Sequence, residues 1–266
     1  GFSLYNLLEI RYFLNRLNMG GKAYAIGDEV WEDAKRKVKE QFGRHTNYEI
    51  IKNIIREFEL THVKTKYKSD LEIFIRESNL EDFYDEKTDT VLVSTMHKAK
   101  GREFDNVFMM LDGFCPNKDE KLRLLYVAMT RAKMNLTIHY NGSYLDSINT
   151  ENLETVNDNN VYLPPRQLAL QLSHKDVHLD FFMSCQRQIS ELFSGDELAV
   201  NGEYCLNEKG QAVLRFSKQG QEKITSVKGN GYMLKSAKIN FIVYWKKENT
   251  DNEIQIILPE LYFERL

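Results

Sequence analysis

The chain has 266 residues, of which 42% are hydrophobic and 28% are charged. This balance is typical of a folded protein with one large domain or two to three small ones, and it excludes extensive disorder. No apolar run approaches the roughly 18 residues of a membrane span, so no membrane partner is expected. The three cysteines lack the spacing of a zinc site or a disulfide framework and indicate reduced thiols in a cytoplasmic protein. The net charge of −3 means that any attraction to nucleic acid must be local.

Residues 1–88 are expected to form a helical domain, because apolar residues recur at helical spacing in four stretches. The second stretch starts at Asp28. The third and fourth open with sequences typical of helix caps, Thr46-Asn47-Tyr48-Glu49 and Ser69-Asp70-Leu71-Glu72. The residues predicted to face the core are Leu7, Ile10, Leu14, Leu17, Trp31, Ala34, Val38, Phe42, Ile51, Ile54, Ile55, Phe58 and Ile75.

Residues 89–160 have the pattern of an α/β domain. Short β-branched or apolar runs predict strands over 90–95, 106–111 and 135–140, and a helix is expected over 119–132. This order predicts a parallel sheet covered by helices. The polar, Asn-rich segment 141–166 is expected to be a linker or domain boundary.

Residues 161–266 are expected to form a third domain, a helix followed by a small β-barrel-like or twisted sheet. The helix is predicted from Ser173 to the Gly195-Asp196 break. Strand-like segments follow at 197–200, 212–216, 232–245 and 253–258, with a hairpin loop between the last two.

Two stretches about 20 residues apart carry side chains suited to binding a phosphorylated ligand. In the first, Gly101 lets the backbone approach a ligand, and Lys98 and Lys100 favour anionic oxygens. Glu103 could accept a hydrogen bond from a sugar hydroxyl. In the second, Arg131 precedes a strand and could stabilise a transferring phosphoryl group. We expect the first stretch to lie at the carboxyl end of a strand, where α/β proteins hold ligands.

Together, these stretches resemble two motifs of one helicase family. Residues 95–104 are similar to motif V of the UvrD/Rep/PcrA-like superfamily 1 helicases, Thr-x-His-x-x-Lys-Gly-x-Glu-Phe. Residues 124–133 resemble motif VI, Leu-x-Tyr-Val-Ala-x-Thr-Arg-Ala-Lys. The resemblance implies a RecA-like, P-loop-type α/β fold over this region. The helical domain before it and the β domain after it, which is expected to be SH3-like or OB-like, carry no motif of this family.

The resemblance also implies roles for single residues. Arg131 matches the arginine that contacts the γ-phosphate of ATP, and Lys100, Gly101 and Glu103 match positions at the nucleotide. Thr95, His97 and Lys98 match positions at single-stranded DNA. Tyr126 and Thr130 are expected to orient the motif VI helix, and Arg102, which replaces a usual leucine, is interpreted as a solvated surface residue.

The sequence lacks a GxxxxGK[S/T] loop and an Asp-Glu pair at the end of an apolar strand. We therefore expect the first RecA-like domain of the parent chain to bind most of ATP and Mg²⁺, and this chain alone to be inactive as an ATPase. The parent would be an ATP-dependent DNA helicase or translocase. The alternative is a non-catalytic DNA- or protein-binding module, but the intact set of Arg131, Glu103 and His97 favours the helicase.

A basic stretch near the end of the chain is a second candidate for contact with single-stranded or junction DNA. Between residues 209 and 247 there are nine lysines and arginines and one acidic residue, Glu222, interleaved with aromatic residues. Protein docking and a solvated lysine face over an aromatic core are the alternatives. The residues predicted to contact DNA are Lys235, Lys238, Lys246 and Lys247.

Overall fold

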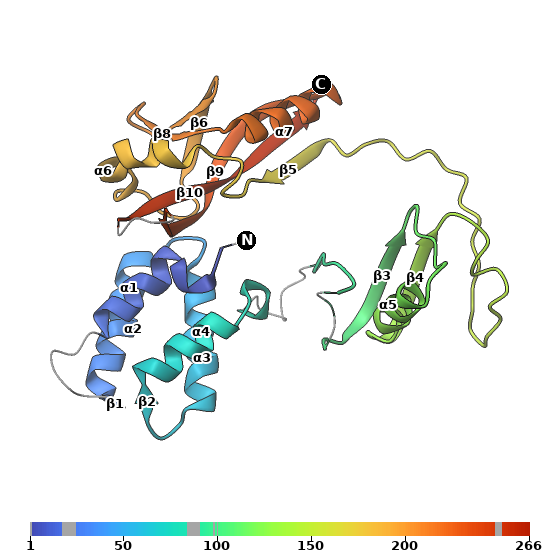
Figure 1. The fold of residues 1–266 in the computed structure, drawn as a ribbon, viewed down its shortest axis with the longest axis horizontal. Coiled ribbons are helices and arrows are strands. Elements are labelled where there is room, and N and C mark those ends of the chain that lie inside the picture. Colours follow the sequence, from blue (N-terminus) through green and yellow to red (C-terminus); the bar gives the residue numbers. More distant parts are fainter. Residues whose placement is uncertain (1, 18–24, 84–90, 98, 100, 248–251) are drawn as a thin grey trace. The chain divides into compact units, whose positions relative to one another are not determined.

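The computed structural model describes the chain except for residues 1, 18–24, 84–90, 98, 100 and 248–251 (Figure 1). It divides into two compact units. Unit 1 contains Gly1–Asp85 together with Leu163–Leu266, and unit 2 contains Glu86–Tyr162. One compact unit can hold more than one domain, so the division into three domains stays a prediction.

The helical part of unit 1 confirms the four predicted helices, and every residue predicted to face the core is buried. These apolar stripes form because residues three and four apart lie on one face of a helix. A short antiparallel strand pair joins residues near the start of the second helix to residues before the fourth. The elements are η1 (Leu4–Asn6), α1 (Leu8–Arg16), β1 (Ala25–Ile26), α2 (Asp28–Phe42), α3 (Tyr48–Thr61), β2 (Lys66–Tyr67), α4 (Lys68–Glu77) and η2 (Leu80–Phe83).

The two predicted helix caps are wrong in detail. Asn47 is the N-cap residue of α3, but its side chain does not cap the helix. Its Nδ2 instead donates a hydrogen bond of 2.9 Å to the carbonyl oxygen of Asn240. Helix α4 begins at Lys68, one residue before the predicted cap Ser69, whose Oγ donates to Asp70. Tertiary and local polar partners thus replace the capping bonds that the sequence suggests.

The C-terminal part of unit 1 is a six-stranded antiparallel sheet with the order β5-β10-β9-β6-β7-β8. This order is open among the described residues, so the barrel-like prediction is not confirmed. The four predicted strand segments are confirmed, and β5 and β7 are additions. The strands are β5 (Gln167–Gln171), β6 (Glu197–Asn201), β7 (Tyr204–Leu206), β8 (Ala212–Arg215), β9 (Tyr232–Lys246) and β10 (Glu253–Arg265).

The continuous helix predicted from Ser173 to Gly195 is wrong. The segment contains only a 3₁₀ helix, η3 (Leu179–Ser184), and a single turn, α6 (Gln186–Ile189). Near its start, the buried Asp176 carboxylate accepts hydrogen bonds of 2.8 Å from the amide and the hydroxyl of Ser173, which fold the backbone into a turn. A helix that was not predicted, α7 (Lys218–Gly229), packs against β9 and is capped by Ser217.

The helical part and the sheet of unit 1 share one hydrophobic core. Leu7 forms an isolated β-bridge with Val243 on β9, and the rings of Phe2 and Phe241 are 5.0 Å apart. The core contains residues from α1, α2 and α3 as well as from β9 and β10. Segments at the two ends of the sequence therefore stabilise each other by burying a common apolar surface.

Unit 2 contains two parallel strands, β3 (Phe104–Leu111) and β4 (Ala132–Tyr140), connected by α5 (Asp119–Met129). These three elements confirm predicted ones. Helix α5 packs on one face of the strands, around a small buried cluster of Met109, Leu111, Leu125 and Ala128.

The first predicted strand of this region, 90–95, is wrong for residues 91–95, which have no regular structure. The side chains of Val91 and Val93 are 82% and 89% exposed. A β-branched run forms a strand only where a neighbouring strand supplies hydrogen-bond partners, and β3 and β4 pair only with each other within the described part of the chain.

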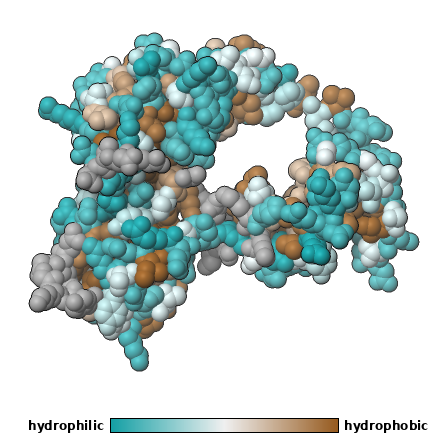
Figure 2. Space-filling model, viewed as in Figure 1, coloured by the Kyte–Doolittle hydropathy of each residue, from teal (hydrophilic) through white to brown (hydrophobic). Residues whose placement is uncertain are grey.

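The molecular surface is largely hydrophilic, with hydrophobic side chains scattered among polar ones on both units (Figure 2). Within the described residues, no helix is long and apolar enough to cross a membrane.

Candidate functional site

Both helicase-like motifs end at the same edge of unit 2. Strands β3 and β4 are parallel, and Phe104 pairs with Ala132, so the segments that precede them meet at the amino-terminal edge of the sheet. The first motif leads into β3, and the second runs through α5 into β4. The expectation that the first motif follows the carboxyl end of a strand is wrong, because residues 91–95 form no strand.

The first motif is a pair of successive turns. The amide of Ala99 donates to the carbonyl of Thr95 at 3.1 Å, and the amide of Arg102 donates to the carbonyl of Ala99 at 3.2 Å. Gly101 has φ +87°, a left-handed conformation that side chains with a Cβ rarely adopt. The glycine is therefore required by the turn itself.

Arg131 joins the two motifs directly. Its Nε donates to the carbonyl of Val127 at 2.8 Å, and one terminal nitrogen donates to the hydroxyl of Thr130 at 3.0 Å. The other terminal nitrogen donates to the carbonyl of Arg102 at 3.2 Å. The carbonyl of Arg131 also accepts a 2.8 Å bond from the amide of Phe104. The guanidinium is thus fixed between the end of α5 and the turn of the first motif.

This arrangement leaves Arg131 able to bind an anion. A guanidinium has five N–H donors, and three hydrogen bonds to neutral oxygens leave two donors for a phosphate. No carboxylate pairs with Arg131 in the ion pairs among the described residues. The side chain is partly exposed, so its positive charge is accessible from solvent.

Of the other described residues predicted for this site, Thr95, His97 and Gly101 lie in this turn segment, and Glu103 follows it directly before β3. Thr95, His97, Gly101 and Glu103 are exposed to solvent. Lys98 and Lys100 lie outside the described residues. Within the described part of the first motif, the residues bonded to Arg131 are Arg102 and Phe104, and the roles of Thr95, His97, Gly101 and Glu103 stay predictions.

Sequence reasoning missed two of the groups that hold Arg131. The carbonyl oxygens of Val127 and Arg102 accept its hydrogen bonds, and a backbone acceptor leaves no signal in the residue type. Arg102 is partly buried, not a fully solvated residue as expected, and its main chain is the part that contacts Arg131. The hydroxyl of Thr130 accepts one of these bonds, and its predicted role in orienting the motif VI helix stays a prediction.

The basic stretch predicted to contact DNA belongs to unit 1, and most of its charges are paired there. Lys235 lies 3.4 Å from Glu264, Lys238 lies 3.5 Å from Glu197, and Lys247 lies 2.9 Å from Asp180. Three more basic residues of the stretch also pair with acids from outside it, in the pairs Lys209–Glu191, Arg215–Glu203 and Lys223–Asp176. The local excess of positive charge read from the sequence is therefore much reduced by tertiary partners.

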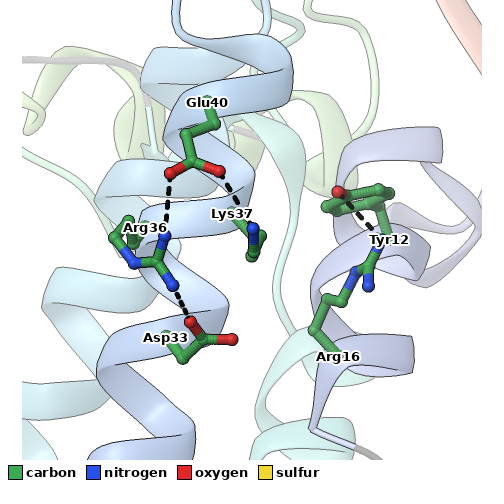
Figure 3. A network of polar contacts seen from close by, with 6 residues as sticks. All are labelled: Tyr12, Arg16, Asp33, Arg36, Lys37 and Glu40. Carbon is green, nitrogen blue, oxygen red and sulfur yellow. Dashed lines mark hydrogen bonds and ion pairs between the residues drawn. The ribbon is translucent and has the colours of Figure 1, made fainter.

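Two basic residues of α2, Arg36 and Lys37, are also paired with acidic residues, here within the same helix. Figure 3 shows Arg36 between Asp33 and Glu40, with Lys37 also paired to Glu40. On α1, Arg16 donates to the hydroxyl of Tyr12 at 3.2 Å. Such exposed pairs contribute little to stability.

The described residues contain no group of three or more His, Cys, Asp or Glu side chains that could hold a metal ion. Burial raises the pKa of the Cys185 thiol to about 11 and that of Cys205 to about 12. Both therefore remain protonated and unreactive at neutral pH. The chemistry of the described site rests on the two motifs of unit 2.

Comparisons with known proteins support the family resemblance of the chain. Residues 16–143 match the family model of the UvrD-like helicase C-terminal domain. The chain is 32% identical over 106 residues to the ATP-dependent DNA helicase Rep of Buchnera aphidicola, an alignment that covers 36% of this chain and 16% of that protein. It is 43% identical over 63 residues to the Rep helicase of Escherichia coli, covering 20% of this chain and 9% of that protein. No solved structure matches.

The fold is that of a mixed α/β protein, and two of its segments resemble helicase motifs V and VI. Residues 16–143, slightly less than half of the chain, are similar to the UvrD-like helicase C-terminal domain, and this match together with the two Rep alignments supports a C-terminal region of a UvrD/Rep-like helicase. Its alignments span less than a fifth of the length of the relatives it matches.

Proposed function

We propose that the chain is the C-terminal part of an ATP-dependent DNA helicase or translocase. In this proposal, unit 2 supplies one side of an ATP site whose other side, with the phosphate-binding loop, comes from a first RecA-like domain of the parent protein. The position of Arg131 carries the proposal, because it bonds to both motifs and keeps two donors available.

The proposed role of Arg131 is to contact the γ-phosphate of ATP. Negative charge spreads over the phosphoryl oxygens during transfer to water, and a fixed guanidinium stabilises this charge. Two hydrogen bonds to backbone carbonyls hold the side chain before ATP arrives, so little reorganisation is needed at the moment of reaction.

The remaining motif residues are assigned to nucleotide and DNA. Lys100, Gly101 and Glu103 would bind the nucleotide, with Glu103 accepting from the ribose. Thr95, His97 and Lys98 would contact the backbone of single-stranded DNA. The run of turns from Thr95 to Arg102 supports a coupling between the two ligands, because the carbonyl of Arg102 also holds Arg131.

Mg²⁺ would be held mainly by the first RecA-like domain and by ATP, since the sequence lacks an Asp-Glu pair at the end of an apolar strand that would hold it. When bound, Mg²⁺ neutralises phosphate charge. In this proposal, the chain contributes the positive charge of Arg131 to the side of the ATP site that unit 2 supplies.

Substitution of Arg131 in the full-length parent tests the proposal. Arg131→Ala should lower DNA-stimulated ATP hydrolysis by about 10³-fold or more while ATP still binds. Arg123→Ala, on the exposed side of α5 outside the motif, is the matched control and should change the rate little. Equal, small effects of both substitutions would overturn the assignment and favour a non-catalytic DNA- or protein-binding module.

We further propose that unit 2 is part of a RecA-like sheet and that the β domain after it is related to SH3-like or OB-like modules. The parallel β3–α5–β4 unit supports the first assignment. The chain alone is proposed to be inactive as an ATPase, because Arg131 completes a site that another domain builds.

The lysines of unit 1 are proposed as a second, weaker contact for single-stranded or junction DNA. Replacing Lys235, Lys238, Lys246 and Lys247 with Glu should weaken DNA binding and flatten its dependence on salt. The pairs with Glu264, Glu197 and Asp180 predict a smaller change in slope than four unpaired lysines would give. An unchanged slope would remove this surface from the proposal.

A further inference from the structure

A buried carboxyl group lies at the joint between the helices and the sheet of unit 1. Glu9 is on α1, and only 1% of its surface is exposed. On either side of it, Leu7 bridges to β9 and Arg11 pairs with Glu253 at 2.5 Å. The first helix is therefore attached to the sheet along the stretch that contains Glu9.

The neighbours of Glu9 come from two other segments and are uncharged. The hydroxyl of Ser194 donates to Oε1 of Glu9 at 3.1 Å, and the backbone amide of Asn47 donates to the same hydroxyl at 3.2 Å. Asn47 also bonds to the carbonyl of Asn240 on β9. The second oxygen of Glu9, Oε2, is buried without a hydrogen-bond partner among the described residues.

The titratable groups of the surrounding segments are engaged elsewhere. His45, two residues before Asn47, stacks on the ring of Phe193 at 4.2 Å. Asp196 accepts a hydrogen bond from the amide of Phe193. On α1 itself, Arg11 is directed to Glu253. No cation in the described segments around Glu9 is therefore in place to compensate a negative charge.

We propose that Glu9 is a proton-linked latch: the protonated, neutral carboxyl lets α1 and the sheet close on each other, and loss of the proton to solvent loosens this joint. A charge buried without a partner is costly, so the closed joint favours the neutral form. The latch lies in unit 1 and does not depend on the ATP and DNA sites proposed in unit 2.

The direction of the pH effect follows from burial. Burial raises the pKa of Glu9 from 4.5 to about 7, against weaker opposing hydrogen bonds. A carboxyl with a raised pKa contributes fully to the free energy of closing the joint below pH 4.5. This contribution is lost as the pH rises through about 7. Between pH 5.5 and 8.5, opening of the joint should therefore become about thirty-fold more favourable.

Hydrogen exchange of the α1 amides in the 266-residue chain tests the latch. Protection factors are compared at pH 5.5 and 8.5 for the unmodified chain and for Glu9→Gln, which has the same shape without the charge. In the unmodified chain the protection of α1 should fall about thirty-fold relative to the variant. Glu49→Gln on the exposed face of α3 is the control and should behave like the unmodified chain.

A second measurement keeps the proposal testable if Glu9→Gln folds poorly. The titration of the Glu9 carboxyl carbon, followed by NMR in the unmodified chain, should have a midpoint near pH 7. Two results would overturn the latch: a midpoint near 4.5, or the same fall in protection with and without the Glu9 carboxyl.

Discussion

Gly220→Ala in α7 should destabilise unit 1, although alanine is normally the better residue in a helix. In the third position of α7, a Cβ on Gly220 would lie 2.1 Å from the carbonyl oxygen of Asp176 and 3.0 Å from its carbonyl carbon. Because both atoms belong to the backbone, neither can move by a change of rotamer. Either the turn at Asp176 or the start of α7 must shift by about an ångström.

Such a shift would strain the contacts that hold this joint together. The carbonyl of Asp176 accepts a 2.9 Å bond from the amide of Ser217, and its carboxylate accepts from Lys223 at 2.8 Å. Overpacking costs about 1–3 kcal/mol, and weakening a bond to a buried carboxylate adds about 1 kcal/mol. These terms outweigh the gain of roughly 1 kcal/mol that alanine brings to a helix, so we expect a net loss of about 1–3 kcal/mol.

Gly229→Ala at the other end of α7 is the matched control. No atom lies within 4 Å of the position of its Cβ, so the substitution should raise stability by a few tenths to about 1 kcal/mol. Urea denaturation of both variants, followed by circular dichroism, gives the two free energies of unfolding, and the melting temperature of Gly220→Ala should fall by about 2–12 °C. The reasoning is refuted if Gly220→Ala is as stable as Gly229→Ala.

Two further predictions concern polar residues of unit 1. Asn47→Ala should cost about 1–3 kcal/mol because it leaves the carbonyl of Asn240 without its buried donor, whereas Thr46→Ala should cost less than about 0.5 kcal/mol because Thr46 does not cap α3. The reverse order in denaturant unfolding would restore the capping box that the sequence suggested. Asp176→Asn should remove part of the acid sensitivity of unit 1. Although burial opposes it, the hydrogen bonds from Lys223 and Ser173 hold the pKa of Asp176 below 3.8, so its contribution is present above that value and is lost as the pH falls further. Melting temperatures measured from pH 2 to pH 7 should fall less steeply at the acid end for the variant, and parallel curves would contradict the assignment.

The four N-terminal helices could be predicted because their information is local. Ile51, Ile54, Ile55 and Phe58 lie on one face of a helix whatever surrounds it, and this face is buried as expected. The helix α7 was missed because its sequence has few apolar residues, with Ile224 its only buried large side chain. Its position depends on Ser217 and Asp176, whose bonds form only in the folded chain.

Strands and charges required the tertiary structure for a different reason. Residues 91–95 have the composition of a buried strand but no neighbour to pair with among the described residues, whereas β9 and β10 pair along their whole length. The basic stretch looked strongly positive because sequence counting ignores distant acids such as Glu264 and Glu197, which lie beside Lys235 and Lys238.

The helix faces, the order of β3, α5 and β4, and the two motifs that resemble those of a helicase family could all be found in the sequence alone. These features depend on residues close together in the chain, where spacing alone decides which side chains share a face or a turn. Only the tertiary structure decided that the helices and the C-terminal sheet share one core, and that backbone carbonyls of Val127 and Arg102 hold Arg131. Such contacts join distant residues or involve the main chain, which is the same for almost every residue type.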